Sequence, residues 1–386
     1  MLTAPAYSGL VPEFPYSRLR RWPDVEADNL QAYDATDLLL VERALALDAP
    51  GSETVVICDE YGAITLALTA AGRHGIRVHQ DLATGRRALS RNAEALGLAG
   101  FTAHELDAEL LAGAKVVLLQ LPKALAELEE ITDAVVRWAA SDVVLIAGGR
   151  VKHMTLTQNE VLGHRFAQVQ AQRAERKSRL IVASEPLPAP STPPFPVSAQ
   201  HDGLTLVAHG GAFAGARLDI GTRVLLEVLG TQAPGAEVDV LDLGCGTGAL
   251  AVSYALAHPE ARVTATDRSA AAVASARATA AVNGVADRVV VTLDDAASDV
   301  PDASVDVVLL NPPFHLGASV HTGAATRLFE AAARVLRPGG ELFTVYNSSL
   351  AYRPELTRLI GATTQVTRTA KFTVTRSIRR SDTPDS

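Results

Sequence analysis

The strongest constraint on the fold of this chain is a pattern of strand, turn and helix that occurs in both halves. In each half, three apolar runs of strand character are followed by turns and helix-like segments in the same order. Sliding one half over the other by 186 positions lays Gly62 on Gly248 and Asp81 on Asp267. With an offset of 191 positions, Gln120 lies on Asn311. We therefore expect a duplicated α/β domain, with helices alternating with the strands of a parallel sheet.

A Pro-rich segment separates the two halves. The run "EPLPAPSTPPFP", residues 185–196, has few backbone N–H donors and predicts an extended linker. The expected domains are therefore residues 1–184 and 197–386, joined by this linker. A chain of 386 residues is long enough for two domains of ordinary size.

The composition limits the class of protein. Hydrophobic residues make up 48% of the chain, yet no apolar run is long enough to span a membrane, and the first residues lack the pattern of a secretory signal. We expect a cytoplasmic protein without a membrane partner. Cys58 and Cys245 are the two cysteines, each inside an apolar run, which argues against a disulfide framework or a metal site. The net charge of −8 excludes coating of nucleic acid by the whole surface but not by a local patch.

A glycine-rich turn in the second half predicts a ligand site. The segment "LDLGCGTG", residues 241–248, places Gly244, Gly246 and Gly248 between a strand and a helix. Glycines allow positive φ angles and a close approach of the ligand, and the helix start offers free N–H groups. The spacing differs from the dinucleotide motif G-x-G-x-x-G. Asp242, just before the turn, would repel a pyrophosphate and favours a cationic ligand instead.

These residues resemble the cofactor-binding loop of class I S-adenosylmethionine-dependent methyltransferases. The resemblance is carried by Asp242 and the three glycines, followed by Asp267 at the end of the next strand. It implies that the glycine turn passes the methionine part of S-adenosylmethionine and that Asp267 holds both ribose hydroxyls. A carboxylate accepts two hydroxyl donors well. The adenine position it implies is Asp295, with Asp294 as its neighbour, in "VVVTLDDAA".

The segment before the first strand of the second half also resembles these enzymes. Residues 210–229, "GGAFAGARLDIGTRVLLEVL", are similar to a segment that closes the cofactor pocket in one branch of the family. Phe213, Asp219 and Thr222 are its candidate cofactor contacts. A simpler alternative is that Asp219 or Thr222 caps the helix starting near Gly221.

The motif "NPPF", Asn311 to Phe314, follows an apolar strand and predicts the catalytic residues. An exocyclic amine is a poor nucleophile because its lone pair is delocalised. The Asn311 side-chain oxygen and the Pro312 carbonyl could accept its two N–H groups and favour a pyramidal nitrogen. Pro312 and Pro313 restrict the backbone, and Phe314 could stack on a base. His315 is either a general base or a packed residue, and the sequence leaves this open.

The whole chain resembles the two-domain ribosomal RNA guanine-N2 methyltransferases, the family of small-subunit methyltransferase C and large-subunit methyltransferase G. The likeness extends from "LQAYDATDLLL", residues 30–40, through "FAGARLDIGTR", residues 213–223, to "KFTVTRSI", residues 371–378. It implies two tandem Rossmann-like methyltransferase domains, the N-terminal one degenerate. It also implies methylation of a guanine of ribosomal RNA, 23S rather than 16S, as naked RNA or in a subunit precursor. Two alternatives stay open: a protein-glutamine N5 methyltransferase, and a non-catalytic cofactor-binding RNA chaperone.

The first half lacks the chemistry of the second. It has Asp59 and Glu60 in its turn and "QLPK" in place of "NPPF", so we expect no cofactor there and a role in substrate recognition or support. Basic residues gather in residues 173–179 and in the C-terminal tail. The tail residues are Arg368, Lys371, Arg376, Arg379 and Arg380. The basic side chains of each cluster could contact phosphates, or they could equally lie on a surface that only faces solvent.

Overall fold

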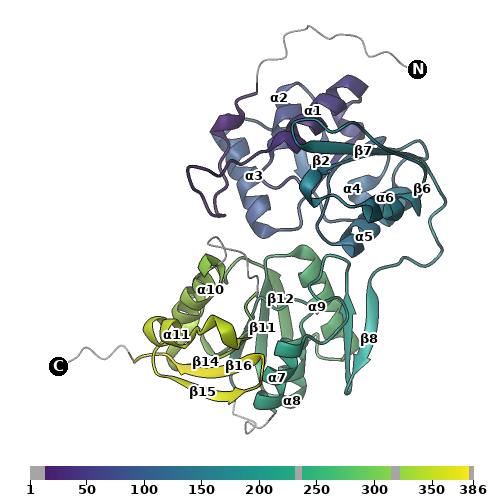
Figure 1. The fold of residues 1–386 in the computed structure, drawn as a ribbon. Coiled ribbons are helices and arrows are strands. Elements are labelled where there is room, and N and C mark those ends of the chain that lie inside the picture. Colours follow the sequence, from purple (N-terminus) through teal and green to yellow (C-terminus); the bar gives the residue numbers. More distant parts are fainter. Residues whose placement is uncertain (1–13, 231–236, 314–321, 382–386) are drawn as a thin grey trace. The chain divides into compact units, whose positions relative to one another are not determined.

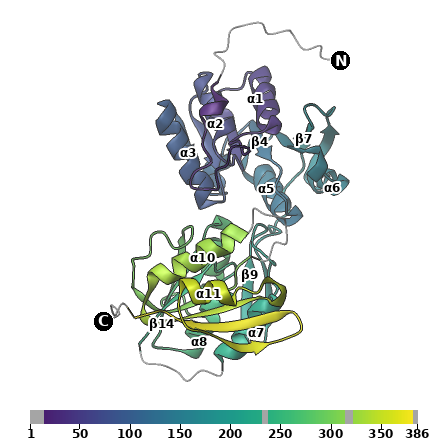
Figure 2. The same ribbon diagram turned by 60° about the vertical axis from the view of Figure 1, so that its left-hand side comes forward.

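The computed structural model describes residues 14–230, 237–313 and 322–381. The chain divides into two compact units, Met1–Pro194 and Phe195–Ser386. Each unit has helices on both faces of a central sheet (Figures 1 and 2).

The sheet of the first unit has seven strands in the order β3-β2-β1-β4-β5-β7-β6. The strands β1 to β5 pair in parallel, whereas β7 pairs antiparallel with β5 and β6. Their bounds are β1 Thr54–Ile57, β2 Ile76–His79, β3 Phe101–Ala103, β4 Val116–Gln120, β5 Val144–Arg150, β6 Phe166–Ala171 and β7 Ser178–Pro186.

Two hydrophobic cores cover the two faces of this sheet. Because side chains alternate along a strand, Val56 of β1 packs in one core and its neighbour Val55 in the other. The first core is closed by α1 Ala35–Leu47, α2 Ala63–Ala70 and α3 Ala83–Leu96. The second is closed by α4 Ala108–Leu111, α5 Leu125–Trp138 and α6 Leu156–Gly163. Strands buried on both faces explain the continuous apolar runs of the sequence.

The second unit repeats this topology strand for strand. Its sheet has the order β12-β11-β10-β13-β14-β16-β15, again with one strand, β16, antiparallel to both of its neighbours. The strands are β10 Asp239–Leu243, β11 Arg262–Asp267, β12 Val289–Leu293, β13 Val305–Leu310, β14 Leu336–Asn347, β15 Thr363–Arg368 and β16 Phe372–Ile378. The helices are α7 Ile220–Leu229, α8 Ala249–Ala257 and α9 Ala270–Val282 on one core, and α10 Thr322–Val335 and α11 Arg353–Leu359 on the other. The predicted α/β fold with two tandem Rossmann-like domains is confirmed.

Short elements complete the described chain. Four 3-10 turns are present among the described residues, at Tyr16–Arg18, Gly51–Glu53, Val151–His153 and Ser348–Leu350. Strand β7 continues to Pro186, so the first two residues of the segment expected as linker belong to the first sheet. None of the helices in the described part of the chain is long and apolar enough to cross a membrane.

A two-stranded hairpin of the second unit packs on α9 through polar side chains. The hairpin is formed by β8 Val197–His201 and β9 Leu204–Ala208. Ser275, Thr279 and Asn283 are spaced by four positions along one face of α9 and its C-terminal cap. Their side chains accept the backbone N–H groups of residues 209, 207 and 205 at 2.9–3.0 Å. The helix therefore satisfies a backbone edge that no third strand of the hairpin sheet pairs.

The strand register brings the two sequence motifs of the second unit to the same edge of the sheet. In the parallel pair β10 and β13, Leu243 lies opposite Leu310. Gly244 and Asn311 follow these residues, so the glycine turn and the "NPP" motif leave the sheet side by side. In the first unit, Ile57 lies opposite Leu119, which places Cys58 and Gln120 in the equivalent positions. The carboxyl ends of central parallel strands are where such sheets bind ligands.

Candidate active site

The glycine turn of the second unit joins β10 to α8 in a left-handed conformation. The φ angles of Gly244, Gly246 and Gly248 are 80°, 54° and 79°, which a side chain would disfavour. A Cβ atom added at Gly244 or Gly246 would meet nothing within 4 Å, whereas one at Gly248 would lie 3.0 Å from Ala276. The first two glycines therefore face open space, and the third allows α8 and α9 to pack closely.

Asp242 places a buried carboxylate directly behind this turn. Its side chain is 1% exposed, and its Oδ2 accepts the backbone N–H of Ala251 in α8 at 2.9 Å. Its Oδ1 is buried and has no hydrogen-bond partner among the described residues. Burial raises the pKa of Asp242 to about 7, and the nearby charge of Asp267 contributes to the rise. A buried acceptor without a partner is costly, so this oxygen suits a cationic or N–H-bearing ligand group.

Asp267, at the end of β11, supports the glycine turn. Its Oδ2 accepts the N–H of Gly246 and its Oδ1 accepts the N–H of Ser269, both at 2.9 Å. A carboxylate oxygen can accept more than one hydrogen bond, which is the chemistry that ligand hydroxyls need.

The two acids after β12 are held by other parts of the second unit. Asp294 accepts the Ser298 hydroxyl and the N–H of Asp299, which closes the turn after the strand. Asp295 forms an ion pair with Arg327 of α10 and is 5% exposed. Both residues lie beside β11, because the N–H of Asp294 donates to the carbonyl of Asp267 at 2.9 Å.

The side-chain amide of Asn311 is oriented by the helix that precedes the sheet. Its Nδ2 donates to Asp219 Oδ2 at 3.1 Å and to Thr222 Oγ1 at 2.9 Å. A carboxylate oxygen can only accept, so the nitrogen of the amide must be the atom that faces Asp219. The Oδ1 of Asn311 is buried and has no partner among the described residues. Within the described part of the chain, the amide therefore presents an acceptor without a donor.

The segment before β10 thus contacts Asn311, and it also caps α7. Asp219 is the N-cap of α7 and accepts the N–H of Thr222 at 3.2 Å, as the simpler alternative predicts. Gly221 lies against the same amide: a Cβ there would be 3.5 Å from Asn311 Oδ1. Phe213, the third residue expected to contact the cofactor, is 65% exposed. The sequence did not indicate that Asp219 and Thr222 orient Asn311, because the contact joins residues about 90 positions apart.

The rest of the "NPPF" motif is described in part. Pro312 is buried and Pro313 is exposed. Phe314 and His315 lie outside the described residues.

The first unit retains two side-chain contacts that correspond to contacts of this site. Asp59 is 1% exposed, and its Oδ2 accepts the N–H of Thr65 at 2.8 Å. Thr65 lies 186 positions before Ala251, so the same helix position binds a carboxylate in both units, although Asp59 follows its strand whereas Asp242 lies within one. Gln120, the counterpart of Asn311, donates its amide nitrogen to Asp37 of α1.

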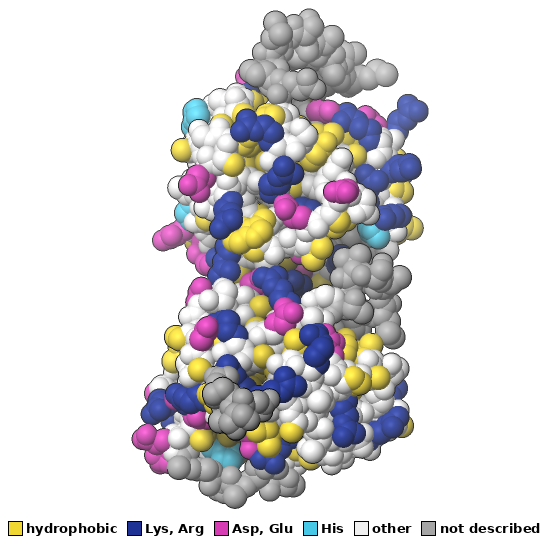
Figure 3. All heavy atoms as spheres, turned by 90° about the vertical axis from the view of Figure 1, so that its left-hand side faces the viewer, with side chains coloured by type: hydrophobic (Ala, Val, Ile, Leu, Met, Phe, Trp, Pro, Cys, Tyr) yellow, Lys and Arg dark blue, Asp and Glu magenta, His cyan; other side chains and the backbone are white. Residues whose placement is uncertain are grey.

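The basic residues of the C-terminal tail are partly engaged inside the second unit. Arg376 pairs with an acid of β14, and Arg379 and Arg380 donate to backbone carbonyls. Arg368 and Lys371 are exposed. Figure 3 shows Lys and Arg side chains spread over the visible face of each unit, with acidic and apolar side chains among them. Of the tail cluster, Arg368 and Lys371 are thus better placed than the other three to meet phosphates.

Comparison with known families matches each unit to a domain. Residues 203–376 match the Methyltransferase small domain, and residues 11–187 match the RLMG N-terminal domain.

Several proteins that are similar over nearly the full length of the chain share a name. A "Ribosomal RNA large subunit methyltransferase G" from Streptomyces coelicolor is 36% identical over 376 residues, which cover 94% of this chain and 97% of that protein. A protein of the same name from Stutzerimonas stutzeri is 35% identical over 373 residues, with coverage of 95% and 98%. Among solved structures, the T. thermophilus 16S rRNA N2 methyltransferase RsmC, in complex with AdoMet and guanosine, has a TM-score of 0.74 at 24% identity, with coverage of 95% and 99%.

Proposed function

Because the chain belongs to the ribosomal RNA large subunit methyltransferase G family, we propose that it methylates a guanine of ribosomal RNA with S-adenosylmethionine as the methyl donor. The acceptor atom is the exocyclic N2 of the guanine, and the RNA is the 23S RNA of the large subunit. The common name of the full-length relatives supports the choice of the large subunit over the small one.

The residues around the glycine turn fit S-adenosylmethionine. The unpaired Oδ1 of Asp242 suits the positively charged methionine end, and the open space at Gly244 and Gly246 lets a ligand approach the backbone. Asp267 has the acceptor capacity for the ribose hydroxyls, and Asp295 borders the adenine position beside Arg327. When bound, the cofactor supplies an electrophilic methyl group on a sulfonium.

The observation that carries the proposal is the orientation of the Asn311 amide. Asp219 and Thr222 hold its nitrogen, so its oxygen, which no described residue pairs, is the acceptor at the end of β13, next to the glycine turn. That oxygen would accept one N–H of the guanine amino group, and the Pro312 carbonyl the other. With both hydrogens held, the nitrogen lone pair is directed out of the base plane, toward the electrophile. Phe314 follows directly in sequence and would stack on the base.

No strong base is required in this mechanism. Methyl transfer leaves a positively charged nitrogen that is far more acidic than the starting amine, so it can release its proton to water. Asn311 cannot act as a base itself, since an amide does not titrate near neutral pH.

The first unit supports the second without binding the cofactor. Residues 1–184 form a degenerate methyltransferase-like domain in this proposal, residues 185–196 the linker and residues 197–386 the catalytic domain. Glu60 occupies the position of Gly246, where a side chain would obstruct a ligand lying on the turn. The protein acts in the cytoplasm, on naked ribosomal RNA or a subunit precursor.

Mapping of methylguanosine in ribosomal RNA from a deletion strain tests this function. Mass spectrometry should find one guanine that lacks its N2 methyl group, and expression of the intact chain should restore it. Asn311→Ala should fail to restore it, whereas Asp81→Ala, the matched change in the first unit, should succeed. Methyl transfer to a glutamine of a peptide release factor and none to RNA would overturn the proposal. Full complementation of growth and of RNA folding by Asn311→Ala would favour a chaperone instead.

A further inference from the structure

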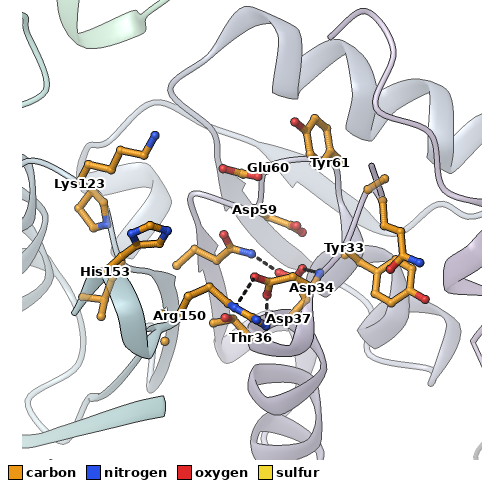
Figure 4. A pocket seen from close by; sticks show the side chains of 18 of the residues that line it. Tyr33, Asp34, Thr36, Asp37, Asp59, Glu60, Tyr61, Lys123, Arg150 and His153 are labelled. Atoms are coloured by element: carbon orange, nitrogen blue, oxygen red, sulfur yellow. Dashed lines mark hydrogen bonds and ion pairs between the residues drawn. The ribbon is translucent and has the colours of Figure 1, made fainter. Parts of the chain in front are cut away.

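The first unit contains a cavity of about 460 Å³ at the carboxyl ends of β1, β4 and β5. This is the position that Asn311 occupies in the second unit. The volume lies in the range of sites for small organic ligands. In Figure 4, Lys123 and His153 stand on one side of the cavity and the rings of Tyr33 and Tyr61 on the other.

Two buried acids and several more exposed charged side chains line this cavity. Asp37 and Asp59 are 3% and 1% exposed and lie at its floor. Burial raises the pKa of Asp37 well above its ordinary range, and the charge of Asp59 adds to the rise. Nearer to solvent, Lys123 and His153 are exposed, as is Glu60, and the half-buried Arg150 forms an ion pair with Asp34 at 3.8 Å. N–H donors at the inner end of a ligand would meet the two buried acids, and a negative group at its outer end could meet Lys123 and His153.

Gln120 presents an amide oxygen to the cavity in the same way as Asn311 does in the second unit. Its Nε2 donates to Asp37 Oδ1, and its Oε1 has no partner in the described chain. In the second unit, the counterparts are Asn311 and Thr222, which is the third residue of α7 as Asp37 is of α1. Gln120 lies 191 positions before Asn311, and both follow or end the fourth strand of their sheet.

A donor lines the same cavity. Gln158 is 6% exposed, and its Oε1 accepts the N–H of Thr155, which fixes its amide. The side chain also lines the cavity, so its Nε2 can donate a hydrogen bond to a ligand acceptor there.

The part of the first unit that corresponds to the cofactor side is filled by a side chain of the protein. Gln80 is 7% exposed; it donates to the carbonyl of Asp59 and accepts the N–H of Leu82. It packs so closely on Gly85 that a Cβ there would lie 2.7 Å from it. The duplication has thus lost the open space beside the turn but retains a cavity at the position of the methyl-accepting base.

We propose that the cavity of the first unit binds a second, unpaired guanine of the RNA substrate and does not modify it. A guanine edge combines two kinds of N–H donor with carbonyl and ring-nitrogen acceptors. Its donors would meet Gln120 Oε1 and the carboxylates, and its acceptors would meet Gln158 Nε2. The tyrosine rings offer the aromatic surface on which unstacked bases pack, and Lys123 and His153 can meet the phosphate. The inference rests on the proposed function only in taking RNA as the source of the guanine.

Photo-crosslinking of the full chain tests the site. The probe is a short single-stranded RNA with one thioguanosine among adenosines, and crosslinked peptides are identified by mass spectrometry. We expect crosslinks to the cavity segments around Tyr33 and Tyr61. Gln120→Met, which keeps the size of the side chain and removes the amide, should lower their yield by about tenfold or more, the range expected for lost hydrogen bonds to a buried ligand.

A second variant helps to distinguish the loss of RNA binding from a folding defect. In Gly149→Val, the added side chain would lie in the cavity, with its Cβ 3.3 Å from the flexible side chain of Leu121. This variant should also abolish the crosslink. Competition by guanosine monophosphate but not by adenosine monophosphate or spermidine supports the proposal.

The opposite results are equally clear. Crosslinks confined to the second unit, unchanged yields in both variants, or competition by spermidine alone would overturn the proposal. If the proposed function is wrong, the results differ in another way. Crosslinks to the second unit would be absent and Asn311→Ala would have no effect, while crosslinks to the first unit could still be measured.

Discussion

The amide nitrogen of Asn311 donates to the carboxylate of Asp219 at 3.1 Å, although 92 positions separate the two residues. Asp219 also caps α7, so the helix start and the end of β13 are tied by one carboxylate. This contact decides which end of the amide faces the substrate. Asp219 is therefore a positioning residue for Asn311 in the mechanism that we propose.

We predict that Asp219→Ala lowers kcat for RNA methylation by about 10- to 100-fold, because the amide can then rotate away from its productive orientation. The KM for S-adenosylmethionine should change little. Steady-state kinetics with both substrates measures the split. Asp219→Asn is the matched control, since its side-chain oxygen can still accept from Asn311 and should preserve most of kcat. A rise in the KM for the cofactor with kcat unchanged would instead make Asp219 a cofactor contact.

Binding of S-adenosylmethionine should weaken as the pH falls below about 7, which is the pKa to which burial raises Asp242. The cationic ligand favours the ionised carboxylate. Below that pH the free protein holds a proton that binding must expel, so Kd should rise by up to about tenfold per pH unit. Calorimetric titration between pH 5 and 8 measures this change. Asp242→Asn should bind weakly at every pH, and a wild-type Kd independent of pH would refute the assignment.

The same carboxylate should make the stability of the cofactor-free protein depend on pH. In the unfolded chain, an aspartate ionises near pH 4, whereas Asp242 in the folded protein ionises near 7. As the pH rises, the unfolded chain loses its proton before the folded protein does, and this stabilises the unfolded state. The free energy of unfolding should therefore fall as the pH rises between these two pKa values, by at most about 1.4 kcal/mol per pH unit. Urea unfolding should show that Asp242→Asn lacks this component. A parallel decline in both proteins would assign the pH dependence to other groups.

Asp267→Ala should abolish cofactor binding, because it removes both the acceptor for the ribose and the support of Gly246. Asp81→Ala, at the corresponding position of the first unit, should leave the Kd unchanged. Isothermal titration with S-adenosylmethionine compares the two variants. Equal losses of affinity in the two variants would contradict the proposal that only the second unit binds the cofactor.

Thr279→Val should destabilise the second unit by about 1–3 kcal/mol, since Val207 would lose the hydroxyl that pairs with its backbone N–H and C=O. The replacement has nearly the same shape, so the loss reports the hydrogen bonds. Val282, on the exposed side of the same helix, provides the control: Val282→Ala should change the free energy of unfolding by less than about 0.5 kcal/mol. Equal effects of the two variants in urea unfolding would show that the polar face of α9 does not hold the hairpin.

The sequence alone was sufficient for the features that depend on neighbouring residues. The alternation of strands and helices, the positive φ angles at Gly244, Gly246 and Gly248, and the duplication all follow from local periodicity and backbone sterics. The pairing of Gln120 with Asn311 was visible for the same reason, because both lie at a fixed distance from an apolar strand.

Only the tertiary structure decided which side chains meet. A linear comparison sets Val56 of the first unit against Asp242 of the second. In space, however, Asp59 is the residue of the first unit whose carboxylate binds the helix position that Asp242 binds in the second. This is possible because a carboxylate can reach the same helix start from two different positions of the backbone. Likewise, Arg376 is a free cation in the sequence and an ion-paired one in the sheet. Such contacts join residues far apart in the chain, and their geometry depends on strand register and helix packing, which local sequence patterns do not encode.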